Sequence, residues 1–115
     1  MHGDRELLLG LFDVAVRAAA PQPSWFSGFE PPKGRTIVIG AGKAAASMAA
    51  AFESVGFPID AGLVVTRYGH RVPTRKIEVV EAAHPVPDEA GVAASRRILS
   101  LVEGLTEEDS VVALI

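Results

Sequence analysis

The sequence predicts an α/β fold with a parallel sheet, and two observations support this prediction. Short β-branched runs alternate with helical segments, an order that produces parallel strands with right-handed connections. Residues 35–45 read as a strand, a two-glycine turn and an alanine-rich helix, which is the layout of a backbone cradle for phosphate. The 115 residues suffice for about one domain, and an apolar content of 49 % indicates a globular protein.

A helix is predicted first, from about Asp4 to Ala20. Its apolar residues recur at spacings of three and four, which places them on one helical face: Leu8, Leu11, Phe12, Ala15, Val16 and Ala19. Prolines then bracket a loop that contains Trp25, Phe26 and Phe29. We expect these aromatic residues to pack as a cover over the core.

Two strands and the helix between them are predicted next. The strands run over residues 36–39 and 62–66. The helix runs from about Lys43 to Val55 and begins with small residues, which let a helix lie close to a sheet. Gly56-Phe57-Pro58 follows it, a sequence that ends helices.

The remaining segments are a strand over residues 77–81, a helix, and a last strand over residues 109–115. The helix begins at residues 87–89, where one proline and two acidic residues suit a first turn. It runs to about Glu103, and Gly104 is the expected C-cap. Its inward-facing residues are expected to be Ala94, Ile98, Leu101 and Val102.

Composition excludes several functional classes. The net charge of −3 comes without a basic stripe, which disfavours nucleic-acid binding. Without cysteine the chain has no disulfide framework and no thiolate metal site. No apolar run reaches the roughly 18 residues that span a membrane, and the N-terminus lacks the order of a signal peptide. We therefore expect a soluble cytoplasmic protein without a nucleic-acid or membrane partner, and the sequence leaves a homo-oligomer open.

The last run, Asp109–Ile115, has the pattern of a buried strand and stops within its apolar residues. Domains seldom end inside a core strand, so we expect an N-terminal piece of a longer protein. Ligands of open α/β sheets bind outside the carboxyl ends of the strands. The piece therefore stops where a further loop of the site is expected.

The strongest candidate for a binding site is the loop Gly40-Ala41-Gly42-Lys43. Glycines let backbone N–H groups approach an anion, and the helix N-terminus adds a partial positive charge. Lys43 adds a full charge that can move with a phosphoryl group. The loop is not a Walker A motif, because one residue separates its glycines and Ala44 follows the lysine. A purely structural tight turn is the alternative.

The same loop matches the dinucleotide pattern G-x-G-x-x-A, with Ala45 in third place. An NAD site also needs an acidic residue at the end of the second strand. Asp60 precedes that strand, and Thr66-Arg67 ends it. The sequence therefore gives poor support for NAD, and NADP is supported only through Arg67.

Two further loops follow predicted strands. In the first, Arg67 and His70 could grip a carboxylate or phosphate, although a surface loop with a packed tyrosine is the alternative. In the second, Pro85 and Pro87 stiffen the chain beside His84, which suits substrate positioning or proton transfer. His84 could equally be a satisfied hydrogen-bonding residue.

The three loops follow strands of one parallel sheet, so they should share an edge and form a site for small anions. His70, His84 and Asp88 could also suggest a metal site, but their spacing fits no standard zinc pattern. No metal site is therefore predicted.

Taken together, residues 39–45, 65–70 and 81–89 resemble the class II glycerate 2-kinases, the glycerate kinases with a C-terminal MOFRL domain. The resemblance covers nearly the whole chain. It implies a Rossmann-like three-layer domain, the N-terminal part of a two-domain kinase with its active site in the cleft. Residues 1–115 would then be an incomplete N-terminal domain, with the MOFRL domain absent from this chain. The implied reaction is ATP-dependent phosphorylation of D-glycerate to 2-phosphoglycerate with Mg²⁺.

By the same resemblance, Lys43 is an active-site residue, and Gly40, Ala41 and Gly42 form the cradle. Arg67, His70 and His84 would contact substrate or phosphate, and family members often have lysine where Arg67 stands. Some members have been labelled hydroxypyruvate reductases, so an NAD(P)H-dependent reductase is the second hypothesis. A non-catalytic anion-binding module is the third. The 115-residue piece alone is expected to be inactive, because it shows no carboxylate set for ATP or metal.

Overall fold

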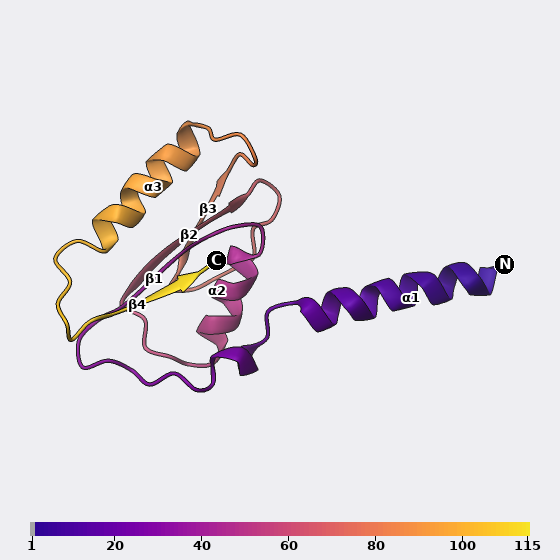
Figure 1. The fold of residues 1–115 in the computed structure, drawn as a ribbon, viewed down its shortest axis with the longest axis horizontal. Helices are drawn as coiled ribbons and strands as arrows, with labels where there is room; N and C mark the ends of the chain where they lie inside the picture. The colour runs from indigo at the N-terminus through magenta and orange to yellow at the C-terminus, as the bar shows by residue number, and fades with distance from the viewer. Residues whose placement is uncertain (1) are drawn as a thin grey trace.

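The computed structural model describes residues 2–115. Its four strands form one parallel sheet in the order β3-β2-β1-β4 (Figure 1), which confirms the predicted fold class. The elements along the chain are α1 (His2–Ala19), the 3₁₀ helix η1 (Pro23–Phe26), β1 (Thr36–Ala41), α2 (Ala45–Ser54), β2 (Ala61–Arg67), β3 (Glu78–Ala82), α3 (Glu89–Leu101) and β4 (Ser110–Leu114).

The sheet lies between two helical layers, with α2 and η1 on one face and α3 on the other (Figure 1). Strand β2 shows this arrangement in two adjacent residues. Successive strand residues point to opposite faces, and Leu63 and Val64 are both almost completely buried. Val64 belongs to the main core with α2, whereas Leu63 lies toward α3. Burial on both faces is typical of parallel sheets.

Several element boundaries differ from the prediction. Helix α2 begins at Ala45 rather than Lys43, because Gly42 has a φ of 131° and the chain must turn before it becomes helical. Helix α3 begins after Asp88, which is its N-cap, and ends at Leu101 rather than near Glu103. Val102 is its C-cap, so Gly104, with a φ of 70°, lies beyond the cap.

Of the three aromatic residues expected to cover the core, Phe26 and Phe29 do so. Phe26 of η1 is buried, and its ring centroid lies 5.3 Å from that of Phe52 in α2. Phe29 lies 6.2 Å from both rings. Trp25 is 53 % exposed, so it does not belong to the packed cluster.

Helix α1 matches the predicted segment, and Figure 1 shows it extending away from the sheet. Its apolar residues are therefore exposed: Leu8 and Phe12 are both 66 % exposed. None of the helices in residues 2–115 combines the length and apolar character needed to span a membrane.

Strand β4 is an edge strand, which corrects the expectation of a buried one. Val111 is 45 % exposed, while Leu114 is buried with α2. The reason is that α3 packs mainly on β2 and β3. In residues 2–115, the α3-side face of β4 therefore stays open.

A buried carboxylate fixes the start of β3. Glu53 of α2 accepts hydrogen bonds from the backbone N–H groups of Arg75 (2.7 Å), Lys76 (2.7 Å) and Ile77 (2.6 Å). Burial alone would raise the pKa of Glu53, but these three bonds and the charge of Arg75 outweigh it, so the pKa is lowered. The carboxylate thus replaces the partners that these amides lack at the strand end.

We expect Glu53→Gln to lower the free energy of unfolding at pH 7 by about 1–3 kcal/mol, because an amide –NH₂ would face a backbone donor. The wild-type contribution is fully present above the unfolded pKa near 4.5 and is lost as the pH falls through the lower folded pKa. The difference between the two proteins should therefore shrink in acid. Urea denaturation across this pH range measures it, with exposed Glu107→Gln as the matched control.

Candidate functional site

A small pocket of about 170 Å³ lies at the carboxyl edge of the sheet, where the three predicted loops meet. The loop after β1 contributes Lys43, the end of β2 contributes Arg67, and the loop after β3 contributes His84. The complete lining is Ala41, Gly42, Lys43, Val65, Thr66, Arg67, Ala82, Ala83 and His84. The predicted juxtaposition of these loops is therefore present.

The glycine loop is held by β2. The backbone N–H of Gly42 donates to the carbonyl of Val65 at 3.0 Å, and the buried hydroxyl of Thr66 donates to the carbonyl of Lys43 at 3.3 Å. Because its N–H is used in this way, Gly42 shapes the loop more than it cradles an anion. Among residues 2–115, the backbone N–H groups of Lys43 and Ala44 have no hydrogen-bond partner, so they are the donors left for a ligand.

Gly40 lies inside β1, paired with Val64 on one side and Leu114 on the other. A Cβ at this position would meet the carbonyl oxygen of Leu114 and lie 3.0 Å from Cγ1 of Val64. The structure therefore gives Gly40 a packing reason to lack a side chain. Gly40 does not line the pocket, whereas Ala41 and Gly42 do.

The pocket carries positive charge without a neutralising partner. Lys43, Arg67 and His84 are exposed side chains, and none of them forms an ion pair within the described part of the chain. No acidic residue lines the pocket. Sites for drug-sized ligands span about 300–1,000 Å³, so this smaller pocket fits a small anion such as a carboxylate or phosphate group.

His70 lies outside this pocket. Gly69 has a φ of 82°, and the N–H of His70 donates to the carbonyl of Arg67 at 3.0 Å, which closes a tight turn. The end of β2 therefore brings Arg67 to the pocket, and the turn that follows carries His70 away from the lining.

The acidic residue of an NAD site is not at the end of β2. Asp60 lies at the opposite end of that strand, where its carboxylate accepts from the backbone N–H of Thr36 at 2.8 Å. The N–H of Asp60 in turn donates to the carbonyl of Thr36 at 3.0 Å. Asp60 therefore joins the amino ends of β1 and β2, while Arg67 occupies the carboxyl end.

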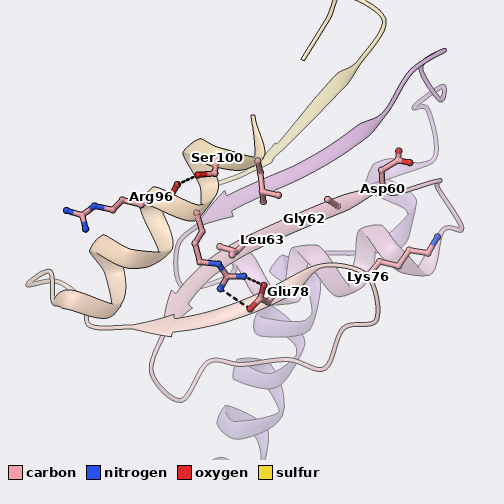
Figure 2. Close-up of a pocket in the computed structure, with 10 residues that line it drawn as sticks. Asp60, Gly62, Leu63, Lys76, Glu78, Arg96 and Ser100 are labelled. Carbon is pink, nitrogen blue, oxygen red and sulfur yellow. Dashed lines mark hydrogen bonds and ion pairs between the residues drawn. The ribbon is translucent and has the colours of Figure 1, made fainter. Parts of the chain in front are cut away.

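A larger cavity, about 570 Å³, lies between α3 and the amino ends of β2 and β3 (Figure 2). Its polar groups are largely bonded within the chain. Glu78 pairs with Arg97, and Ser100 donates to the carbonyl of Arg96 at 3.1 Å. The side chain of Arg96 points away from the floor formed by Gly62 and Leu63 (Figure 2). Acidic as well as basic side chains line this cavity, so it lacks the one-sided positive charge of the smaller pocket.

The described residues do not provide a metal centre. In residues 2–115, no group of three or more His, Asp or Glu side chains is arranged to hold a metal ion. Mg²⁺ is usually held through carboxylates and substrate phosphates, and the pocket offers none of the former. The pocket thus fits a small anionic group, and the residues present do not fit Mg²⁺.

Known proteins resemble this chain over nearly its whole length. Residues 7–115 match DUF4147, described as a domain of unknown function. An Agrobacterium vitis protein, provisionally named a hydroxypyruvate reductase, is 49 % identical over 113 residues, which are 96 % of this chain and 26 % of that protein. The D-glycerate 2-kinase of Thermotoga maritima is 48 % identical over 83 residues, 70 % of this chain and 20 % of the kinase.

A solved structure shows the same fold. The crystal structure of glycerate kinase from Thermotoga maritima aligns with 100 % of this chain at a TM-score of 0.76 and 35 % identity. The alignment covers 28 % of the kinase chain. The chain therefore spans about a quarter of the length of its relatives.

The backbone at Gly42 yields a stability prediction. A Cβ at Gly42 would meet no atom within 4 Å, but its φ of 131° is one that L side chains rarely adopt. Gly42→Ala should therefore lower the free energy of unfolding by about 1–3 kcal/mol through backbone strain alone.

Gly10 is the matched control, because its Cβ would also meet no atom within 4 Å and it lies within helix α1. Gly10→Ala should be neutral or stabilising by up to about 1 kcal/mol. Urea denaturation of both variants makes the comparison, and equal effects would contradict the strain argument.

Proposed function

Because the chain belongs to the DUF4147 family, the N-terminal domain of the glycerate 2-kinases, we propose that it forms half of a phosphoryl-transfer site. The reaction is transfer of the γ-phosphoryl group of ATP to D-glycerate, which yields 2-phosphoglycerate and ADP. Residues 1–115 act as an incomplete N-terminal domain, and the rest of the site, including a MOFRL domain, is contributed from outside this chain.

The observation that supports this proposal is the convergence of Lys43, Arg67 and His84 on one pocket without an acidic residue. Phosphoryl transfer is mainly positioning and neutralisation of negative charge. A glycerate carboxylate and a transferring phosphoryl group both need cations, and oriented donors act best where the charge develops. A chain with a net charge of −3 has no other evident reason to bring Lys43 and Arg67 together.

Each side chain has a distinct role in the proposed reaction. The hydroxyl oxygen on C2 of glycerate forms a bond to the γ-phosphorus, and the bond from that phosphorus to the β–γ bridging oxygen breaks. Lys43 neutralises charge on the phosphoryl group during this exchange. Arg67 binds a carboxylate or phosphate, and His84 accepts the hydroxyl proton or orients that hydroxyl.

Mg²⁺ would neutralise the phosphates of bound ATP. Since no carboxylate lines the pocket, its protein ligands would come from outside residues 2–115. The roles of Lys43, Arg67 and His84 in the proposed reaction do not depend on where those ligands lie.

The second candidate is an NAD(P)H-dependent hydroxypyruvate reductase. It is favoured by the name of the Agrobacterium vitis relative and by the G-x-G-x-x-A loop. The bonds of Asp60 to Thr36 weigh against it, because they hold this acid at the amino end of β2. Only Arg67 could recognise the 2′-phosphate of NADP, and Lys43 would have no clear task in hydride transfer.

Lys43→Ala in the full-length protein should lower kcat for glycerate phosphorylation by at least about 10²-fold, the scale of losing one charge-stabilising donor. Lys33→Ala is the matched control, because Lys33 is an exposed lysine in the loop before β1. A coupled assay for ADP measures both variants. Near-normal turnover by Lys43→Ala would remove Lys43 from the proposed site.

Two assays of the wild-type protein distinguish the kinase from the reductase. With hydroxypyruvate and NADPH, the wild-type protein should show no steady loss of absorbance at the nicotinamide wavelength. With glycerate and ATP, it should release ADP in proportion to the phosphoglycerate formed. The reverse pattern would favour the reductase, and binding of substrate without turnover in either assay would favour the non-catalytic module.

A further inference from the structure

Two residues that the proposed reaction does not use, Tyr68 and Asp88, join the end of β2, which carries Arg67, to the loop that carries His84. The hydroxyl of Tyr68 donates to Oδ2 of Asp88 at 2.8 Å. Tyr68 directly follows Arg67 at the end of β2, and Asp88 directly precedes α3. The bond therefore links the first residue after β2 to the far end of the loop after β3.

Asp88 uses its two carboxylate oxygens for different purposes. Oδ1 accepts from the backbone N–H of Gly91 at 3.0 Å and caps α3, while Oδ2 accepts from Tyr68. The bond to Asp88 raises the pKa of Tyr68, and the same bond, together with that of Gly91, lowers the pKa of Asp88. Each oxygen therefore has its own donor, and the cap does not depend on the tyrosine.

Besides the stiffness of Pro85 and Pro87, few restraints hold the segment between the end of β3 and the start of α3. The backbone N–H of Tyr68 donates to the carbonyl of Ala82 at 3.2 Å, which holds the start of the segment. Within the described chain, no side chain of residues 83–87 forms a hydrogen bond. The position of His84 relative to Arg67 thus depends on the end of β3 at one side and on Asp88 at the other.

We propose that Tyr68 is a positioning residue, whose hydrogen bond to Asp88 fixes the separation of Arg67 and His84 across the pocket. The proposal rests on the proposed function, because these two side chains are the groups that would bind the acid. Tyr68 itself is absent from the pocket lining and 51 % exposed. It acts through the geometry of its neighbours, where small misplacements of catalytic groups are costly.

The first test uses the full-length protein with glycerate and ATP. Tyr68→Phe keeps the ring and removes the hydroxyl, and it should lower kcat about fivefold, as expected for one lost hydrogen bond, with an unchanged KM for ATP. Asp88→Ser keeps a capping side chain but is too short to reach Tyr68, so it should lose a similar factor. The double variant should then be no worse than either single variant.

Arg97→Ala is the matched control. It removes another exposed side-chain link to α3, the pair between Arg97 and Glu78 of β3 at the opposite end of the strand (Figure 2). This variant should keep the wild-type kcat. A loss equal to that of Tyr68→Phe would show that any loosening of α3 lowers activity, and it would overturn the positioning role.

A second readout is independent of the substrate. Hydrogen exchange measured by mass spectrometry should be faster at the non-proline amides of residues 83–88 in Tyr68→Phe than in wild type, with α2 unchanged. Unaltered exchange in that segment, or a wild-type kcat for Tyr68→Phe, overturns the proposal. Absence of phosphorylation by the wild-type protein overturns the proposed function instead, and faster exchange would then still establish the link between the two loops.

Discussion

The parallel register of β1, β2 and β3 is the constraint on which the candidate site depends. Because the three strands run in the same direction, their following loops emerge at one edge, and Lys43, Arg67 and His84 meet there. The register requires close packing around β1, where Gly40 leaves room for Leu114 and Val64. The residue that permits this approach therefore contributes to the site indirectly, through the position of the strands.

Carboxylates with local structural roles support this arrangement. Glu53 satisfies three backbone donors at the start of β3, Asp60 joins the amino ends of β1 and β2, and Asp109 accepts from the backbone N–H of Arg35 at 2.7 Å. Each of these acids lies away from the pocket and is occupied by a backbone partner. Their bonds stabilise the ends of the strands, while the cations at the carboxyl edge stay available for a ligand.

The sequence predicted the parts of the fold that depend on local pattern. Apolar periodicity located the strands and helices, and the alternation of these elements predicted parallel pairing, hence the meeting of Lys43, Arg67 and His84. The parts that depend on tertiary contacts could not be predicted. In the sequence Thr66 is an ordinary strand residue, and only the structure shows its hydroxyl bonded to the glycine loop. His70 is only three residues after Arg67, and the turn at Gly69 directs it away from the pocket that Arg67 lines. The open face of β4 likewise depends on where α3 lies, which no local pattern contains.

The bond between Gly42 and Val65 has a consequence for how the loop can respond to a ligand. A phosphate-binding loop whose amides are all free can close around its anion by rotating peptide planes. In this loop one amide is already engaged with the neighbouring strand, so such a rotation would break a sheet-like bond. The Gly42 peptide is therefore preset, and in the proposed site adjustment to different anions would fall to the free amides of Lys43 and Ala44 and to the long, flexible side chain of Lys43.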